Sequence, residues 1–486
     1  MANKLVITNK NEAYVKVNCT EDITYELREY FTFLVPGYQF TPQYKSRLWD
    51  GKIRLFDTRT REVYRGLVPY ITKLCEESGY EWEYEDESYN QEFSVKEAQE
   101  FIKSLNLSDK YIPRDYQFEA FVHAIRSRRA LLLSPTASGK SLIIYLIMRY
   151  INAKRTLIIV PTISLVSQLA TDFADYGFQS DKLVHRIFGG QDKQTDKPVV
   201  ISTWQSLIEL DKKYFEQFDV VIGDEAHLFK AKSLVGIMTS LVNAKYRIGT
   251  TGTLDGTKTH KLVLEGLFGP VRQVTTTKEL MDLGHVADFN IKCLLLKHPD
   301  LACKALKKAT YQQEIEYLVL NESRNKFISN LSLSLKGNTL VLYQYVDKHG
   351  ELLYEMINSK IGDRKCFFIS GKTDVEIREE TRQIVEKENN AIIIASYGTF
   401  STGVNIKNLH NIIFASPSKS RVRNLQSIGR GLRKSDTKDS AVLYDIADDL
   451  RYKKHENFTL KHFVERIRIY SEEKFDFKIY KIELKV

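Results

Sequence analysis

Cysteine is scarce in this sequence and has no spacing that would organise a fold. The 486 residues contain five cysteines, which are widely scattered and form no C-x-x-C pair. We therefore expect neither a disulfide framework nor a zinc cluster as the basis of the structure. The reducing cytoplasm is the compartment that this cysteine usage favours.

Long hydrophobic runs are also missing, as is a secretory signal. The longest obvious apolar stretch, 142–148, is far shorter than the roughly 20 residues that cross a bilayer. Residues 1–10 contain charged and polar side chains and no apolar core of a signal peptide. With only 10 prolines and 24 glycines, the composition excludes collagen-like repeats and long disordered tails. We expect a globular protein without a membrane partner.

Charge of one sign is only slightly in excess, and its distribution is more informative than its total. Lys and Arg outnumber Asp and Glu by 71 to 62, a formal net charge of +9. Residues 1–110 contain 15 basic and 19 acidic residues, which leaves 56 basic and 43 acidic residues for 111–486, a net charge of +13. A polyanionic partner for the body of the chain is one interpretation, and a mildly basic surface is the other.

Short apolar runs alternate with helix-length segments from residue 114 onward. Buried parallel strands read as nearly continuous apolar runs, so two series of strands are expected. The first series is 130–133, 156–160, 199–202, 220–223 and 246–250, and the second is 339–343, 366–369, 391–395, 411–415 and 441–444. This alternation predicts an α/β fold with two lobes in tandem, each built on a parallel sheet.

A loop that resembles a phosphate-binding turn follows the first expected strand. The string SPTASGKS at 134–141 matches the phosphate-loop pattern at Gly139, Lys140 and Ser141, with Ser134 in place of the first glycine. The N–H groups of such a loop converge on phosphate oxygens. We expect Lys140 to neutralise the β- and γ-phosphates of ATP and Ser141 to hold Mg²⁺. A plain polar turn is the alternative for this string alone.

A pair of carboxylates follows another expected strand. The string DEAH at 224–227 begins where the apolar run 220–223 ends. Asp224 is suited to hold Mg²⁺, and Glu225 is suited to orient or deprotonate the attacking water. Both should emerge at the carboxyl edge of the sheet that carries the phosphate loop. Two solvated surface acids are the alternative.

The order of the motifs resembles that of the superfamily 2 helicases and translocases. The matching strings are RDYQ at 114–117, SPTASGKS at 134–141, VPT at 160–162, STWQ at 202–205, DEAH at 224–227, TGT at 251–253, SYGTFSTG at 396–403 and QSIGRGLR at 426–433. Their order across 114–433 is far more specific than any single string. The resemblance implies two RecA-like lobes with ATP bound between them.

The same resemblance implies roles for individual residues. Further contacts to ATP are expected from Arg114, Gln117, Thr136, Ser138 and Gly403. Coupling of hydrolysis to movement is expected from His227, Thr251 and Thr253. Nucleic-acid contacts are expected from Pro161, Thr162, Thr203, Trp204, Gln205, Ser396 and Thr402.

The last of these motifs has a physical basis of its own. Arg430 and Arg433 lie three residues apart and follow Gln426, so the two guanidinium groups would share one face of a helix. Guanidinium forks suit the γ-phosphate, and we expect all three residues to take part in hydrolysis. A basic surface helix is the alternative. Because this motif lies in the second lobe, ATP would close the lobes and hydrolysis would release them.

The N-terminal segment contains a predicted hairpin. Asp50 and Gly51 form the preferred two-residue turn, which would pair Trp49 with Lys52. One face of this hairpin would carry Arg47, Trp49, Lys52 and Arg54, and the other Leu48, Ile53 and Leu55. A basic face with one aromatic side chain would suit contacts to phosphate groups. A solvated hairpin with Trp49 in the core is the alternative.

This segment also resembles the N-terminal domain of phage UvsW-type recombination helicases. The resemblance rests on GYQFTP at 37–42 and LWDGKIRL at 48–55, and more thinly on FSTG at 400–403 and EKFD at 473–476. It implies a branched DNA substrate (Holliday junctions, forks and R-loops), ATP and Mg²⁺ as cofactors, and recombination proteins as partners. It also implies a monomer or weak oligomer in the cytoplasm of a phage host.

The expected organisation is two RecA-like parallel-sheet lobes preceded by a small α+β DNA-binding domain. The expected boundaries are 1–105 for the N-terminal domain, 106–275 for lobe 1, 276–335 for a connecting segment, 336–450 for lobe 2 and 451–486 for a helical tail. Two alternatives share this core: an RNA helicase or restriction-type double-stranded DNA motor, and a non-enzymatic nucleic-acid clamp.

Overall fold

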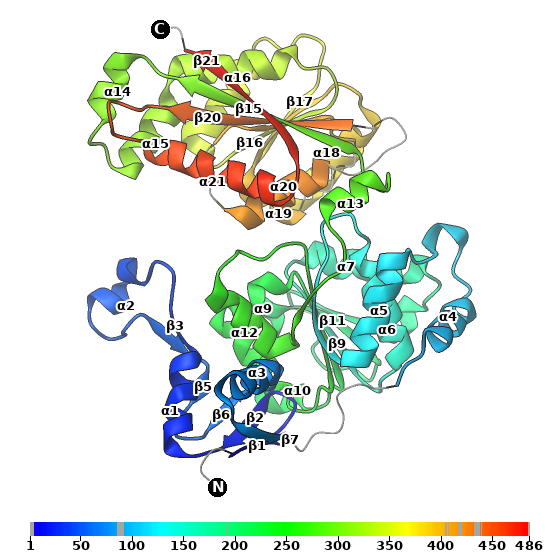
Figure 1. Cartoon of the computed structure of the whole chain (residues 1–486). Coiled ribbons are helices and arrows are strands. Elements are labelled where there is room, and N and C mark those ends of the chain that lie inside the picture. The colour runs from blue at the N-terminus through cyan, green and yellow to red at the C-terminus, as the bar shows by residue number, and fades with distance from the viewer. Residues whose placement is uncertain are drawn as a thin grey trace. The chain divides into compact units, whose positions relative to one another are not determined.

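The chain forms two compact units, each of which is described by itself (Figure 1). The computed structural model describes residues 4–84, 92–190, 192–403, 406, 408–416, 420–431, 438 and 440–484. The first unit contains the chain up to residue 134 and residues 139–274, and the second contains the rest. No helix in the described part of the chain has the length and apolar character needed to cross a membrane.

The N-terminal part of the first unit is a mixed five-stranded sheet in the order β5-β6-β2-β1-β7, next to a separate two-stranded sheet of β3 and β4. Its elements are β1 (Lys4–Asn9), β2 (Tyr14–Asn18), α1 (Glu21–Tyr30), β3 (Thr32–Leu34), η1 (Tyr38–Phe40), α2 (Pro42–Lys45), β4 (Lys52–Arg54), β5 (Phe56–Asp57), β6 (Glu62–Tyr64), η2 (Arg65–Leu67), α3 (Val68–Ser78) and β7 (Glu81–Tyr84). The expected α+β domain is confirmed.

The rest of the first unit is built on seven parallel strands in the order β10-β11-β9-β12-β13-β8-β14. Its elements are α4 (Val95–Ser104), η3 (Asp109–Tyr111), α5 (Asp115–Ser127), β8 (Arg129–Leu133), α6 (Lys140–Ile151), β9 (Thr156–Val160), α7 (Ile163–Asp175), α8 (Ser180–Leu183), β10 (Val184–Ile187), β11 (Val199–Thr203), α9 (Trp204–Leu207), α10 (Lys212–Phe215), β12 (Val220–Asp224), η4 (Ala226–Lys230), α11 (Lys232–Ser240), β13 (Tyr246–Thr251), α12 (Lys258–Phe268) and β14 (Val271–Gln273). All five strands expected here are confirmed, and the sheet has β10 and β14 in addition.

The alternation of side chains along these strands divides the core between the two faces of the sheet. Leu131 and Leu157 point into a core shared with α11, α12 and the N-terminal domain. Their neighbours Leu132 and Ile158 point into a second core with α5, α6 and α7. The N-terminal domain therefore shares its hydrophobic core with one face of the parallel sheet.

A half-buried acid joins the N-terminal domain to this sheet. The Glu12 carboxylate accepts from Arg65 at 2.6 Å and from Arg129, the first residue of β8, at 2.7 Å. Gly66 lies close to the backbone of α12, because a Cβ built there would lie only 2.0 Å from the carbonyl oxygen of Glu265. Tyr70 adds a hydrogen bond to the Glu265 carboxylate at 2.5 Å.

Replacing Gly66 with alanine is expected to lower the free energy of unfolding by about 1–3 kcal/mol, because rigid backbone must move to admit one methyl group. Thermal unfolding of the full chain followed by circular dichroism measures this decrease. Gly236→Ala is the matched control: its Cβ would meet no atom within 4 Å, and alanine favours the helix α11 in which it lies. Equal melting temperatures for the two variants would contradict the close approach.

The second unit has its own seven parallel strands, in the order β17-β18-β16-β19-β20-β15-β21. Its elements are α13 (Thr277–Asp282), β15 (Asp288–Lys297), α14 (Asp300–Leu306), α15 (Tyr311–Leu320), α16 (Glu322–Ser334), β16 (Thr339–Tyr343), η5 (Val346–Gly350), α17 (Glu351–Asn358), β17 (Cys366–Ile369), α18 (Val375–Lys387), β18 (Ile392–Ser396), α19 (Tyr397–Gly403), β19 (Asn411–Phe414), α20 (Arg421–Gly431), β20 (Ser440–Asp449), α21 (Phe458–Glu472) and β21 (Asp476–Glu483). All five strands of the second expected series are present, so the prediction of two parallel-sheet lobes is confirmed.

Two expectations about the flanks of this lobe need correction. The segment 276–335, expected as a connection, contributes the ten-residue strand β15, which pairs with both β20 and β21. The segment 451–486, expected as a helical tail, is helical over α21 but ends in the edge strand β21. Residues of β21 are mostly exposed, so the strand has no continuous apolar run of the kind that reveals a buried strand in a sequence.

Candidate active site

The carboxyl edge of the first parallel sheet gathers the residues expected to bind a nucleotide. The phosphate loop follows β8, and Asp224 ends β12. Between these two strands lies β13, whose last residues are Thr250 and Thr251. Because the strands are parallel, these groups meet at one edge, as the sequence predicts.

The phosphate loop uses left-handed backbone at two positions. Gly139 has φ +79°, a left-handed conformation that favours glycine, and a Cβ there would meet the Gln117 amide nitrogen at 2.4 Å. Ala137 also has φ +68°, a conformation that glycine adopts more readily. Within the loop, the Ser138 hydroxyl donates to the Pro135 carbonyl at 2.7 Å. Lys140 begins α6 and donates from Nζ to the Ser134 carbonyl at 3.3 Å.

Gln117 lies against this loop. Its side-chain oxygen accepts from the backbone N–H of Arg114 at 2.9 Å, and its amide nitrogen donates to the Gly139 carbonyl at 3.4 Å. Arg114 in turn donates to the Tyr116 hydroxyl at 2.9 Å. Gln117 is therefore held between the start of α5 and the phosphate loop, and its contact with ATP stays a prediction.

Asp224 and Glu225 form the acidic centre of the site. Burial raises the pKa of Asp224, and the neighbouring Glu225 carboxylate raises it further, while Lys140 and a hydrogen bond from Thr250 oppose both effects. Thr250 donates to Asp224 Oδ1 at 2.7 Å. Glu225 has a left-handed backbone, φ +51°, which turns the chain sharply after the strand. Its carboxylate lies 3.3 Å from His227 Nδ1.

His227, Thr251 and Thr253 are brought together. The Thr251 hydroxyl donates to the Thr253 carbonyl at 3.1 Å, so its oxygen is left to accept from His227 Nδ1 at 3.0 Å. The same His227 nitrogen faces Glu225, so one imidazole links the acidic centre to the loop after β13. A role for this link in coupling remains a prediction.

The residues of this edge fit a nucleotide with a divalent cation. The glycine-containing loop opens onto the N-terminus of α6, where backbone N–H groups attract phosphate oxygens. The mutual repulsion of Asp224 and Glu225 is relieved by a hard cation, and carboxylate and hydroxyl oxygens are the ligands that Mg²⁺ prefers. Ser141, the second residue of α6, supplies such a hydroxyl.

The nucleic-acid candidates of the first unit lie at the starts of two helices at the same edge. Thr162 caps α7, since its hydroxyl accepts from the Leu165 N–H at 3.4 Å, and Pro161 precedes it. The Thr203 hydroxyl lies 3.0 Å from that of Ser206. Trp204 and Gln205 begin α9, with Trp204 half-buried against the core and Gln205 exposed.

The described candidates of the second unit lie on α19 and α20 and at the end of β18. Ser396 precedes α19 and its hydroxyl accepts from the Thr399 N–H at 3.2 Å, while Thr402 and Gly403 are the last residues of that helix. Gln426 and Arg430 lie on α20, and Gln426 is half-buried. Arg433 lies outside the described residues.

Two further arginines at the start of α20 have partners within the protein. Arg421 is paired with Glu472 and, at 2.6 Å, with Glu473 on the C-terminal side. Arg423 stacks on Tyr397, with 5.7 Å between the guanidinium carbon and the ring centroid. Both side chains therefore have partners within the second unit.

The predicted hairpin around Asp50 does not form. Strand β4 (Lys52–Arg54) pairs instead with β3 (Thr32–Leu34), and Val35 donates to the Gly51 carbonyl at 2.8 Å. Thr41 caps the short helix α2, which begins at Pro42, and Arg47 takes a left-handed φ of +59°. The residues before the turn thus have helical or left-handed backbone and cannot form the extended strand that the hairpin requires.

The side chains of this segment are consequently not divided between the two faces that the hairpin prediction requires. Leu48, expected on the packed face, is 83% exposed, and Trp49 is half-buried with its indole N–H donating to the Lys52 carbonyl at 2.9 Å. Arg54 is ion-paired with Asp50. An open cavity of about 550 Å³ is lined by Gln39, Tyr44, Lys45, Arg47, Leu48, Trp49 and Asp50.

Sequence reasoning missed Thr250, whose hydroxyl holds Asp224. The signal was present, since Thr250 ends an expected strand and directly precedes the TGT string. A threonine in a strand is usually a packing residue, which hides a functional role of this kind.

Three family models match separate parts of the chain. "DNA helicase UvsW, N-terminal" matches residues 5–85, "Type III restriction enzyme, res subunit" matches 110–256, and "Helicase conserved C-terminal domain" matches 322–435. These ranges follow the N-terminal domain and the two parallel sheets.

Individual relatives match nearly the whole chain. The ATP-dependent DNA helicase uvsW of Enterobacteria phage T4 is 35% identical over 97% of this chain and 98% of its own length. The crystal structure of T4 UvsW has a TM-score of 0.53 and 33% identity, over 99% of this chain and 100% of that one. The DNA 3'-5' translocase XPB2 of Sulfurisphaera tokodaii is 26% identical over 79% of this chain and 93% of its own.

Proposed function

Because the chain belongs to the UvsW family of superfamily 2 DNA helicases, we propose that it hydrolyses ATP to remodel branched DNA such as Holliday junctions, stalled forks and R-loops. Membership of this family makes the chain an ATP-dependent DNA helicase. The branched substrate is supported by the full-length similarity to a phage helicase, which includes the N-terminal domain as well as the motor lobes.

We assign the chemistry to the carboxyl edge of the first sheet. Lys140 neutralises the β- and γ-phosphates, and Ser141 and Asp224 hold Mg²⁺, which supplies charge compensation at the transferring phosphoryl group. Thr250 fixes the direction of the Asp224 carboxylate. Glu225 takes the proton of the attacking water.

We assign the response to the γ-phosphate to α20 of the second unit. Arg430, which shares α20 with Gln426, would stabilise the charge that develops in hydrolysis, together with Arg433, which lies outside the described residues. Because these arginines and Lys140 belong to different lobes, hydrolysis would depend on closure of the lobes, and each turnover would drive one cycle of movement. The residues that flank α7, α9 and α19 supply the DNA contacts within the lobes.

We define the basic arm as residues 32–54, which contain β3, α2 and β4. The arm has four basic residues against one acid, whereas residues 1–110 as a whole have more acids than bases. Its acid, Asp50, is already paired with Arg54, which leaves the exposed Lys45, Arg47 and Lys52 to meet phosphate groups. Two exposed apolar side chains, Phe40 and Leu48, offer surfaces for unpaired bases.

Replacing Lys45, Arg47 and Lys52 together with alanine is expected to weaken junction binding and to lower the salt slope of binding by about 1 for each phosphate that these side chains neutralise. ATP turnover without DNA should be unchanged. Fluorescence anisotropy with a labelled four-way junction at several salt concentrations gives the slope.

The control removes the same charge from exposed lysines of the first unit outside the arm, namely Lys16, Lys73 and Lys103. If the affinity fell equally in both triple variants, the arm would be no more than part of the general positive surface.

A panel of DNA and RNA activators tests the proposed substrate. Turnover of ATP and strand products are measured with forks, four-way junctions, R-loops, linear duplex and duplex RNA. Preference for the branched DNAs is expected. Strongest activation by duplex RNA would favour an RNA helicase, and equal activation by linear duplex a restriction-type motor. Tight DNA binding without ATP turnover would favour the non-enzymatic nucleic-acid clamp.

A further inference from the structure

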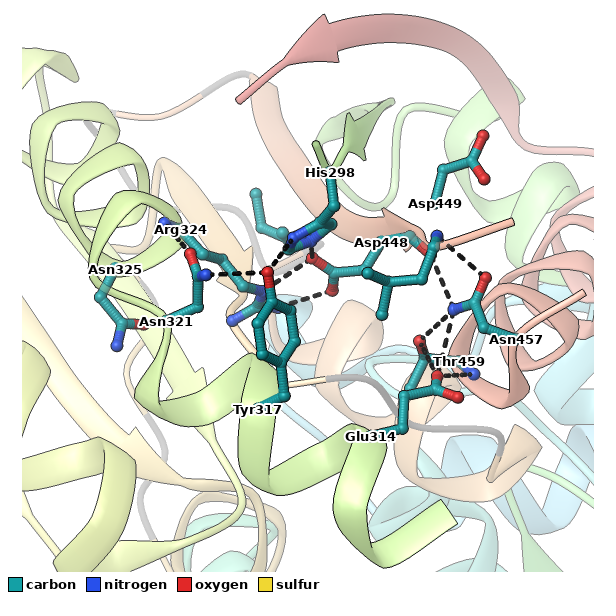
Figure 2. Close-up of polar contacts among 12 residues, drawn as sticks. His298, Glu314, Tyr317, Asn321, Arg324, Asn325, Asp448, Asp449, Asn457 and Thr459 are labelled. Atoms are coloured by element: carbon teal, nitrogen blue, oxygen red, sulfur yellow. Dashed lines mark hydrogen bonds and ion pairs between the residues drawn. The ribbon is translucent and has the colours of Figure 1, made fainter. Parts of the chain in front are cut away.

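Ala415, the residue that follows β19, is held by a buried arginine. Figure 2 shows Arg324 of α16 lying against the Asp448 carboxylate at the end of β20. Arg324 donates from Nε at 2.8 Å and from Nη2 at 3.0 Å to this carboxylate, which also accepts from His298 at 3.0 Å. Arg324 Nη2 donates in addition to the carbonyl oxygen of Ala415 at 2.9 Å.

This ion pair is permanent at physiological pH. Burial by itself would raise the pKa of Asp448, but Arg324 and His298 together hold it below its usual range. Both Arg324 and Asp448 are fully buried. The Ala415 carbonyl therefore accepts from an arginine whose position is fixed by its buried ion pair with Asp448.

The next residue, Ser416, is held through its side chain by His349. Asn325 donates from its amide nitrogen to a carbonyl, so its oxygen accepts from His349 Nε2 at 3.2 Å. His349 Nδ1 is then the acceptor for the Ser416 hydroxyl at 3.0 Å. Burial, reinforced by Arg324, lowers the pKa of His349 to about 3, so the neutral ring persists. The Ser416 oxygen also accepts from the Gln344 N–H at 3.1 Å.

The carbonyl oxygen of Ser416 is held by Tyr397. The Tyr397 hydroxyl donates to it at 3.1 Å, and this tyrosine is the first residue of α19 and only 2% exposed. The ring of Tyr397 also contacts α20, because Arg423 of that helix stacks on it. One tyrosine thus belongs to α19 and contacts both the residue that leads toward α20 and α20 itself.

We propose that Tyr397 is a positioning residue that transmits DNA binding at α19 to the arginine helix α20, with Ala415 and Ser416 as its fixed anchor. Three oxygen atoms of the anchor are bound, to Arg324, to His349 and to Tyr397. Of these three bonds, that to Tyr397 comes from the helix expected to contact DNA. The inference rests on the proposed function, because it needs ATP turnover that DNA stimulates.

The test removes one hydroxyl group and compares the result with removal of a matched hydroxyl group elsewhere in the second unit. Tyr397→Phe deletes the bond to Ser416, and Tyr343→Phe deletes a bond of the same kind, a buried tyrosine hydroxyl donating to the Ile369 carbonyl at 3.1 Å. Each variant should melt about 2–4 °C lower, as expected when one hydrogen bond is removed from a domain of this size. Melting temperature, ATP turnover with and without forked DNA, and DNA affinity are measured on the full chain.

Only Tyr397→Phe is expected to reduce the stimulation of ATP turnover by DNA, by about fivefold, the size of one neutral hydrogen bond. Its turnover without DNA and its DNA affinity should stay at the wild-type level. Equal stimulation in both variants would overturn the proposal, as would a decrease that occurs equally with and without DNA. Failure of the wild-type chain to respond to DNA would instead count against the proposed function.

A second variant keeps the proposal testable if Tyr397→Phe does not fold. Ser416→Ala removes the hydroxyl that His349 holds and leaves the Ser416 carbonyl in place. It loosens the same anchor from the other side, so it should also reduce DNA stimulation more than turnover without DNA. An unchanged ratio of stimulated to unstimulated turnover in a folded Ser416→Ala protein would contradict the role of the anchor.

Discussion

Replacing Glu225 with glutamine is expected to lower kcat for ATP hydrolysis by about 10²–10⁴-fold while ATP still binds, because the amide cannot accept the proton of the attacking water. Glu225 follows β12 with a left-handed backbone, and its carboxylate lies beside His227. Steady-state turnover with forked DNA measures kcat, and a fluorescent nucleotide measures binding.

The variant Asp224→Asn distinguishes the role of the Asp224 carboxylate from that of the Glu225 carboxylate. Asp224 is held by Thr250 and is assigned to Mg²⁺, so its amide variant should raise the Mg²⁺ concentration needed for half-maximal turnover. Glu225→Gln should leave that concentration unchanged. If the two variants had the same dependence on Mg²⁺, the division of labour between these acids would be wrong.

Replacing Lys140 with alanine is expected to lower turnover by about 10²–10³-fold and to weaken nucleotide binding as well. A positively charged group that is held in place beside the negative charge developing on the phosphate accelerates hydrolysis by a factor of this size. Lys140 stands at the first residue of α6, next to the left-handed Gly139, with its ammonium group within reach of the Ser134 carbonyl. Turnover and fluorescent-nucleotide binding are measured side by side.

The control for this variant is Lys154→Ala, an exposed lysine beyond the C-terminal end of α6. It removes the same charge from the same lobe and should keep wild-type turnover. Turnover of Lys140→Ala within a few-fold of this control would show that the loop does not carry the phosphates.

The predicted hairpin shows how local turn chemistry can point to the wrong partner. Asp50 and Gly51 do turn the chain, and Asp50 even accepts from the Lys52 N–H at 3.1 Å. However, the helix that begins at Pro42 uses the residues before the turn, so β4 finds its partner in β3. Strand pairing depends on which segment is free to pair, and turn propensity does not contain that information.

The polar network of the second unit could not be read from the sequence either. Arg324, His349 and Asp448 are separated along the chain, and each one alone reads as an ordinary polar residue of a helix or strand. Only the fold brings them to the same end of the sheet, where each is buried and therefore needs a hydrogen-bond partner within the protein. The same is true of Glu12, which joins the N-terminal domain to β8.

By itself, the sequence determined the two parallel-sheet lobes and the polar residues at the carboxyl edge of the first sheet. Buried strands and phosphate loops are encoded by short contiguous patterns, which is why a sequence reveals them. Lys140, Asp224 and Glu225 lie at the end of such patterns. The tertiary structure decided the pairing of β4, the edge strand β21, and the anchor of Ser416 beside Tyr397. These depend on contacts between residues distant in the chain, and a contact of that kind is selected by packing and desolvation of the whole domain.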